Sequence, residues 1–294
     1  MHKPVLTKEV IRCLNLKKGG TYLDATVGCG GHAALILEKI SPGGFLIGVD
    51  VDEEALTYAR RKLSKFKKSS YKIIKSNFKN IDFILEDIGI RKIDGALFDL
   101  GVSLLQFKNA SRGFSINLDG ALDMRMDLSQ GLNAFDIVNK YPEKELYRII
   151  REFGEERYAG RIARFICEKR KTSRIRTTSE LANVITRAVG HRYSKSKIHP
   201  ATRTFQAIRI TVNKELDVLS EALEKLPFIL NKGARVCVIS FHSLEDRIVK
   251  NYFKRYAKEN KFLLVNKKPI VPSVEEVKEN PRSRSAKMRV AEFK

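Results

Sequence analysis

The stretch "TYLDATVGCGGHAALIL", residues 21–37, decides the fold of this chain. Apolar residues with strand character run up to Asp24, a glycine turn with the pattern G-x-G-x-x-[GA] follows at 28–33, and helical spacing begins at 31. Glycines let the backbone approach a ligand closely, and the start of the following helix offers free N–H groups. The stretch therefore predicts a strand–turn–helix unit that holds a nucleotide-like cofactor.

Strand and helix patterns alternate along the rest of the N-terminal third. Further strands are expected at "FLIGVD", "YKIIK" and "IDGALFDL", and helical patterns separate them at 52–66 and 79–88. Four strand–helix units within about 100 residues predict a parallel sheet with helices on both faces.

The alternation of strand and helix patterns stops after the fourth strand. Residues 107 to about 212 show helical patterns and loops but no clear strand, whereas "ARVCVISF", "KFLLVN" and "KMRVAEF" are strand-like again. The simplest arrangement is one α/β sheet domain built from residues 1–106 and 217–294, interrupted by a helical insert domain at 107–216.

Composition limits the class of protein. Hydrophobic residues make up 43% of the 294, enough for a sizeable core, yet no apolar run approaches the ~18 residues that span a membrane. The N-terminus lacks the apolar segment of a signal peptide. The four cysteines are far apart, with no C-x-x-C pair, which argues against a zinc site or a disulfide framework. We expect a cytoplasmic protein without a metal site or a membrane partner.

The formal net charge is +22, and part of it is clustered. Residues 161–197 contain eleven basic and two acidic side chains. Clustered positive charge is typical of a polyphosphate partner, because binding releases condensed counterions. The alternative is a genome that favours lysine. An anionic membrane is less favoured, since no basic stretch accompanies an exposed apolar helix face.

Three aspartates narrow the choice of cofactor. Asp50 closes the second strand about 20 residues after the turn, where an acid accepts hydrogen bonds from a ribose diol. NAD and S-adenosylmethionine both carry such a ribose. Asp24 would repel a dinucleotide's pyrophosphate but suits the ammonium and sulfonium end of S-adenosylmethionine. Asp99 ends the fourth strand, at the carboxyl edge beside the cofactor. An NAD-dependent oxidoreductase and a ligand-free Rossmann-like domain remain as alternatives.

Motifs along nearly the whole chain carry a specific resemblance. They are "HKPVL" (2–6), "LDATVGCGGH" (23–32), "GVDVDEEAL" (48–56), "FDLGVS" (98–103), "RGFS" (112–115), "LDMRMD" (122–127), "FGEER" (153–157), "HPATRTFQAIRITVNKEL" (199–216), "VISFHSLEDRIVK" (238–250) and "NPRSRSAKMRV" (280–290). With them the chain resembles the bacterial ribosomal RNA small-subunit methyltransferase H family, also known as MraW, which methylates N4 of a cytidine in 16S ribosomal RNA.

The resemblance implies a fold, an activity and a site. The fold is α/β, a Rossmann-like class I S-adenosylmethionine-dependent methyltransferase sheet with a helical insert domain. The cofactor is S-adenosyl-L-methionine, and the partner is 16S rRNA within the small subunit or its late precursor; a homodimer is also allowed. The cofactor-binding positions carried over are Gly30, Gly31, His32, Asp50 for the ribose, Phe78 for the adenine, Asp99 and Gln106.

Some positions depart from the family pattern. Cys29 and Ala33 stand where glycine and serine are common, and "VSLLQFK" at 102–108 replaces a more usual V-S-S-P-Q-L-D. The double proline of the [DNS]-P-P-[YFW] loop in amino-methylating DNA enzymes is absent after Asp99. We take Asp99 as the candidate catalytic residue, as a cofactor contact and an acceptor for the amine.

Other candidates have two interpretations each. His242 lines the site or caps the helix that follows it. His199 and Arg203 approach the RNA backbone or are structural, and Phe114 and Phe205 stack on the target base or belong to the core. A non-catalytic RNA-binding or assembly factor on a methyltransferase scaffold is the third alternative for the whole chain.

Overall fold

The computed structural model describes residues 4–190 and 198–294. It divides into two compact units, Met1–Gly101 with Leu216–Lys294, and Val102–Glu215. We call the first the sheet unit and the second the insert unit, and describe each by itself. The sequence predicts the changes of domain at 106/107 and 216/217, a few residues further along the chain.

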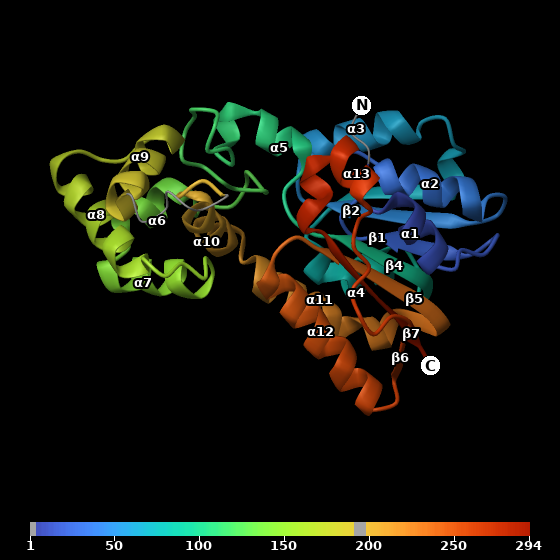
Figure 1. The fold of residues 1–294 in the computed structure, drawn as a ribbon. Coiled ribbons are helices and arrows are strands. Elements are labelled where there is room, and N and C mark those ends of the chain that lie inside the picture. Colours follow the sequence, from blue (N-terminus) through green and yellow to red (C-terminus); the bar gives the residue numbers. More distant parts are fainter. Residues whose placement is uncertain (1–3, 191–197) are drawn as a thin grey trace. The chain divides into compact units, whose positions relative to one another are not determined.

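The sheet unit contains a sheet of seven strands among the described residues, in the order β3-β2-β1-β4-β5-β7-β6 (Figure 1). The strands are β1 (Thr21–Asp24), β2 (Phe45–Asp50), β3 (Tyr71–Lys75), β4 (Ile93–Asp99), β5 (Leu230–Ser240), β6 (Phe262–Leu264) and β7 (Lys287–Phe293). The predicted parallel sheet is confirmed for β1 to β5. The two predicted closing strands are also present, and β7 runs antiparallel to both β5 and β6.

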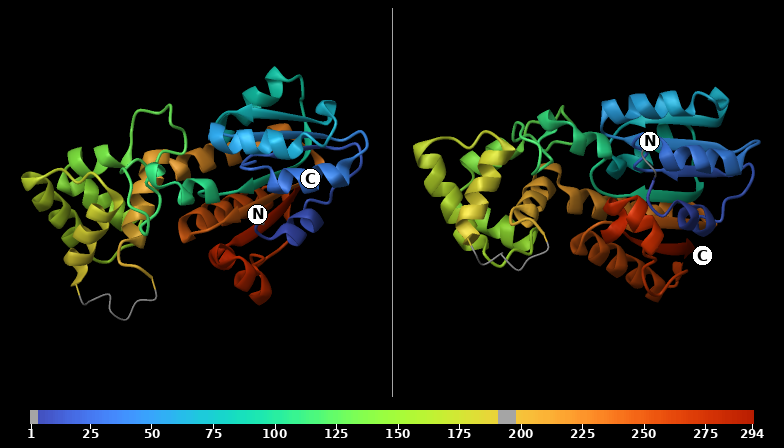
Figure 2. Two further views of the ribbon diagram at one scale, coloured as in Figure 1. Left: turned by 90° about the horizontal axis from the view of Figure 1, so that it is seen from above. Right: turned by 45° about the horizontal axis from the view of Figure 1, so that its top comes forward.

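Helices cover both faces of this sheet (Figures 1 and 2). One face buries α1 (Thr7–Cys13), α2 (Gly31–Ile40) and α3 (Glu53–Leu63); the other buries α4 (Ile81–Asp87), α11 (Glu215–Ile229) and α12 (Ser243–Lys258). Successive strand residues point to opposite faces. Tyr22 and Leu46 therefore join the core under α2, while Leu23 and Ile47 join the core under α11. Burial on both sides explains why these strands read as nearly continuous apolar runs.

Two short elements of the sheet unit were not expected from the sequence. Helix α13 (Val274–Glu279) and the 3₁₀ turn Pro281–Ser285 lie between β6 and β7. The α13 side chain Glu276 accepts a 2.7 Å hydrogen bond from the backbone N–H of Leu6, which ties this segment to the N-terminal residues. Near the C-terminus, the basic side chain of Arg289 is also structural, because it makes an ion pair with Asp246 at 2.6 Å.

The insert unit is helical, as its sequence pattern predicts. Its helices are α5 (Leu104–Lys108), α6 (Ala134–Lys140), α7 (Glu143–Glu152), α8 (Ala159–Thr172), α9 (Thr178–Val189) and α10 (Thr202–Asn213), around a separate apolar core. Arg112 of "RGFS" and Asn213 shape the loop that contains "LDMRMD". The Arg112 guanidinium donates to the carbonyls of Arg125 and Met126, each at 3.0 Å. The Asn213 amide accepts from Met126 N–H at 2.7 Å and donates to the Met124 carbonyl at 2.8 Å.

No helix in the described part of the chain is both long enough and apolar enough to cross a membrane.

Candidate functional site

Three carboxylates stand at one edge of the sheet. Asp24, Asp50 and Asp99 end β1, β2 and β4, and these strands are neighbours in the order β2-β1-β4. Because the three strands are parallel, their carboxyl ends lie at the same edge, where open α/β sheets bind their ligands. The fold thus brings together residues that are 26 and 49 positions apart in the sequence.

Asp50 is held by the backbone of the glycine turn. Its Oδ2 accepts a 2.9 Å hydrogen bond from Gly28 N–H, and its Oδ1 accepts a 3.0 Å bond from Asp52 N–H. Burial raises the pKa of Asp50 above its ordinary value, and these two donors oppose the rise. A carboxylate oxygen can accept more than one hydrogen bond, so both oxygens keep capacity for a ribose diol.

The glycines of the turn serve different purposes. Gly28 and Gly30 adopt positive φ angles of 48° and 76°, which favour glycine. A Cβ on Gly30 would lie 3.2 Å from Ala59 Cα, and one on Gly31 would lie 2.5 Å from Pro4 Cγ. From the sequence we expect these glycines to let a ligand approach closely. In the structure Gly30 and Gly31 allow α3 and the N-terminal segment to pack, whereas a Cβ on Gly28 would meet no other atom closer than 3.9 Å. The contact of Gly30 and Gly31 with the cofactor stays a prediction.

His32 connects this turn to the carboxylates. It lies in the first turn of α2, is 5% exposed, and places its Nε2 atom 3.6 Å from Asp99 Oδ2. Neither ring nitrogen of His32 has a hydrogen-bond partner, and neither does the buried Asp99 Oδ1 atom. Buried polar atoms are nearly always hydrogen-bonded in native proteins, so a polar ligand at this edge would satisfy them. These residues fit the predicted cofactor.

Asp24 is the most deeply buried of the three carboxylates, at 1% exposure. Burial raises its pKa to about 7, while His32 and a hydrogen bond from Thr26 N–H lower it. The nearby Asp99 and Asp50 charges add to the rise. A buried carboxylate beside two others is costly alone, and a cationic ligand would stabilise it.

The position of Asp99 is fixed through its own backbone. Asp99 N–H donates to Thr26 Oγ1 at 2.7 Å, and the following Leu100 N–H donates to the Ile239 carbonyl at 3.0 Å. The side chain of Asp99 is 22% exposed, so it is partly accessible from solvent. Part of this carboxylate is therefore open to solvent, as the candidate catalytic role requires.

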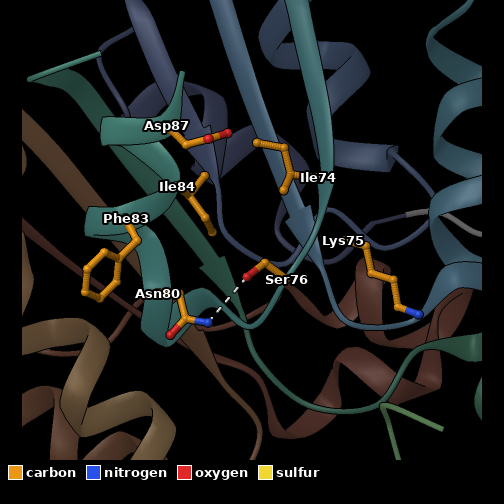
Figure 3. Close-up of a pocket in the computed structure, with 7 residues that line it drawn as sticks. All are labelled: Ile74, Lys75, Ser76, Asn80, Phe83, Ile84 and Asp87. Carbon is orange, nitrogen blue, oxygen red and sulfur yellow. Dashed lines mark hydrogen bonds between the residues drawn. The ribbon is translucent and has the colours of Figure 1, made fainter. Parts of the chain in front are cut away.

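Phe78 follows β3 in the short 3₁₀ turn Phe78–Asn80. Its ring is partly buried and meets Phe98 edge-to-face, with centroids 5.6 Å apart and an interplanar angle of 87°. Its predicted place beside the adenine stays a prediction. A nearby hollow of about 430 Å³ lies between the end of β3 and α4 (Figure 3), and its lining residues are Ile74, Lys75, Ser76, Asn80, Phe83, Ile84 and Asp87. The three site aspartates do not line it.

Gln106 belongs to the insert unit. It is buried, and its Oε1 atom accepts a 3.0 Å hydrogen bond from Ser103 N–H in a capping box at the start of α5. This capping role gives Gln106 a structural function, and its cofactor contact also stays a prediction.

For His242, Phe114 and Phe205 the contacts in the structure favour a structural role. His242 caps α12, because its Nδ1 atom accepts from Glu245 N–H while Glu245 accepts from the backbone of His242. Phe114 and Phe205 are each 5% exposed in the core of the insert unit. This burial supports the interpretation that both rings belong to the core.

His199 and Arg203 have local structural contacts. His199 Nδ1 accepts a 3.1 Å hydrogen bond from Ala201 N–H just before α10, and its side chain is exposed. Arg203 donates to the Glu155 carbonyl at 3.0 Å. These bonds support the structural interpretation, and an approach of either residue to RNA stays a prediction.

The strand order, with its antiparallel seventh strand, and the three carboxylates define a class I S-adenosylmethionine-dependent methyltransferase. A crystal structure of a methylase from Clostridium thermocellum has the same fold, with a TM-score of 0.50 and 13% identity over all of both chains.

A family model narrows this class further. The chain belongs to the MraW methylase family, whose model matches residues 1–294. This membership decides between the two cofactors in favour of S-adenosylmethionine and against NAD.

Similar proteins from other bacteria support membership of this family. The chain is 50% identical to a protein of Caldicellulosiruptor bescii over 99% of this chain and 98% of the relative. It is 52% identical to one of a Sulfurihydrogenibium species over 98% of each chain. The identity to one of Clostridioides difficile is 48%, over 99% and 98%. All three relatives are named ribosomal RNA small subunit methyltransferase H.

Proposed function

We propose that the protein transfers a methyl group from S-adenosylmethionine to N4 of a cytidine in 16S rRNA, within the small ribosomal subunit or its late precursor. The observation that carries the proposal is the cluster of Asp24, His32 and Asp99, whose buried polar atoms are poised for a cationic cofactor beside a partly exposed carboxylate. Membership of the MraW methylase family and the names of the relatives support the choice of rRNA.

Each residue has a distinct task in this proposal. When bound, S-adenosylmethionine supplies an electrophilic methyl group. Asp50 accepts hydrogen bonds from its ribose, and Asp24 faces its cationic end. Asp99 borders the reacting amine.

The amine of cytosine is a poor nucleophile, because its lone pair is delocalised into the ring. It must lie roughly 3 Å from the methyl carbon and in line with the bond that breaks. Transfer of that methyl group would leave S-adenosylhomocysteine and a positively charged nitrogen, which must lose a proton. Asp99 accepts that proton as a general base. Because the amine itself attacks the methyl group, no covalent intermediate is required.

The target base must leave its stack or be single-stranded to reach the sheet edge. Basic side chains of the insert unit then hold flanking phosphates, which set position without reading sequence. Arg174 and Arg176 are exposed and suit this task. Arg170 does not, because it donates to the carbonyls of Val138 and Tyr141, and Arg164 is paired with Glu168. Three further basic residues of the cluster lie outside the described residues: Arg192, Lys195 and Lys197.

Mass spectrometry of the modified nucleosides in rRNA tests the proposal directly. Cells that lack the protein should lose N4-methylcytidine from 16S rRNA, and the purified protein with S-adenosylmethionine should restore it in small subunits from those cells. N4-methylcytidine at the normal level in the deletion strain would refute the proposed reaction.

Replacing Asp50 with alanine should weaken S-adenosylhomocysteine binding by about 10- to 100-fold, because hydrogen bonds to a charged group contribute about 1.5–3 kcal/mol. RNA affinity should change by less than about twofold. Isothermal calorimetry and fluorescence anisotropy measure the two affinities. Equal losses for both ligands would contradict the assignment of Asp50 to the ribose.

Charge reversal of Arg174 and Arg176 to glutamate should have the opposite effect. RNA affinity should fall at least about tenfold at moderate salt, and the dependence of affinity on salt should become shallower, because two phosphate contacts are lost. S-adenosylhomocysteine binding should be unchanged. The matched control reverses Lys140 and Arg164 together, which are already paired with Asp136 at 2.6 Å and with Glu168 at 2.8 Å.

A further inference from the structure

A second basic segment lies in the sheet unit. Residues 55–81 contain nine basic and no acidic side chains. Together with residues 161–197 they carry eighteen of the formal +22 charges, so the rest of the chain is close to neutral. A genome that favours lysine would spread positive charge along the chain. The concentration in two segments therefore indicates a function for each.

Five of these side chains are exposed cations with no acidic partner among the described residues. We call them the β3-edge patch: Arg61, Lys67, Lys68, Lys72 and Lys75. Two other cations of the segment are already neutralised, since Arg60 pairs with Glu53 at 2.7 Å and Lys65 pairs with Glu38 at 2.9 Å. Lys62 and Lys79 are half-buried, which leaves the five residues of the patch available to an external anion.

The fold gathers the patch at one side of the sheet unit. Arg61 lies in α3, Lys67 and Lys68 lie at the 3₁₀ turn before β3, and Lys72 and Lys75 lie in β3 itself. β3 is the first strand of the sheet order and pairs with β2. Lysines on an edge strand also prevent pairing with another sheet. Protection of the sheet edge explains the lysines within β3. It does not explain Lys67 and Lys68 before the strand or Arg61 on α3.

The patch begins beside the cofactor residues. Lys75 is in register with Asp50 in the pairing of β3 with β2, and the next residue, Ser76, donates its N–H to the Asp50 carbonyl at 3.0 Å. Tyr58 precedes Arg61 by about one helical turn on α3 and is 46% exposed. An exposed aromatic ring among cations is typical of single-stranded nucleic-acid surfaces, where bases stack.

We propose that the β3-edge patch binds the phosphate backbone of the rRNA substrate, as a contact surface on the sheet unit additional to the insert. This inference rests on the proposed function. Lysines act as point charges toward phosphates and need no base sequence. RNA is favoured over an anionic membrane, because Tyr58 is the one exposed large apolar side chain among residues 55–81 and membrane-surface helices bury a whole apolar face.

The test uses the full chain and a fluorescent single-stranded fragment of 16S rRNA, with the dissociation constant measured over a range of KCl concentrations. One variant changes Lys67, Lys68, Lys72 and Lys75 to glutamine. A second variant, Arg61→Gln with Lys67→Gln and Lys68→Gln, leaves the edge strand intact, so it separates RNA binding from strand protection. The matched control changes four exposed lysines elsewhere in the sheet unit to glutamine: Lys254, Lys258, Lys267 and Lys268.

If each lysine contacts one phosphate, the slope of log affinity against log salt should become shallower by about 3 in the first variant and by about 2 in the second. RNA affinity should fall at least about tenfold in both, while S-adenosylhomocysteine binding and the control variant stay as in the wild type. Variants that match the control in affinity and slope would overturn the proposal. So would unchanged RNA binding combined with lost binding to phosphatidylserine vesicles, which would assign the patch to a membrane.

A wild-type protein without affinity for RNA would overturn the patch assignment and the proposed function together. Wild-type RNA binding and methylation that persist fully in both patch variants would overturn the patch assignment alone.

Discussion

Replacing Asp24 with asparagine should stabilise the ligand-free protein at pH 8 by on the order of 4 kcal/mol and weaken cofactor binding by about 10- to 100-fold. The stabilisation follows from the pKa of Asp24, which burial raises from 3.8 to about 7. Well below pH 3.8 the carboxyl is neutral in the folded and unfolded protein. As the pH rises from 4 to 7 the unfolded protein releases its proton first, so the wild type loses stability across this window. The asparagine variant should not.

The titration of Asp24 should also govern the affinity for the cofactor. The ammonium group binds the ionised carboxylate, so the affinity of the wild type for S-adenosylhomocysteine should rise as the pH increases from 6 to 8 and then level off. In the asparagine variant the affinity should be lower and should vary less with pH.

Urea unfolding and calorimetry at four pH values between 5 and 8 measure both effects. Asp87→Asn serves as the control, since it removes a carboxylate from an exposed position on α4. Equal stability of wild type and Asp24→Asn at pH 8 would show that the buried carboxylate of Asp24 does not destabilise the folded protein.

Replacing Asp99 with asparagine should reduce the rate of N4-methylcytidine formation by about 10²- to 10⁴-fold, the range typical for loss of a positioned proton acceptor. Asparagine keeps a hydrogen-bond acceptor of similar size but cannot take up the proton that the amine loses. The backbone bond from Asp99 N–H to Thr26 Oγ1 does not depend on the side chain, so the strand end should keep its geometry.

Single-turnover methylation of small subunits, followed by mass spectrometry, measures this rate. RNA affinity and thermal stability serve as controls and should match the wild type. Full N4-methylcytidine formation by a folded Asp99→Asn variant would remove Asp99 from the chemistry. A deletion strain with normal N4-methylcytidine would instead favour the non-catalytic RNA-binding alternative.

Local chemistry made part of the site predictable. An aspartate that ends an apolar run before a turn lies at the carboxyl end of a strand, and parallel strands present those ends at one edge. Asp24, Asp50 and Asp99 could therefore be placed at one edge before the strand order was known. The positive segment at 55–81 was also visible in the sequence, but only the fold gathers its side chains around β3.

Other features depended on partners far along the chain. The packing of Gly31 against Pro4 and of Gly30 against Ala59 has no sequence pattern, because each contact depends on how another segment folds back. Arg170 donates hydrogen bonds to carbonyls at the end of α6, and a count of charges in the sequence cannot reveal this role.

The sequence by itself determined the alternation of strands and helices, the glycine turn, the helical insert and the family. These features depend on periodicity and on residues that are neighbours in the chain. The tertiary structure decided which carboxylates are adjacent and which side chains lose water. Strand order places β1 between β2 and β4, and this order buries Asp24 and His32 beside Asp99. Desolvation and charge proximity act through space, so the pKa of Asp24 and the unpaired atoms of His32 exist only in the folded chain.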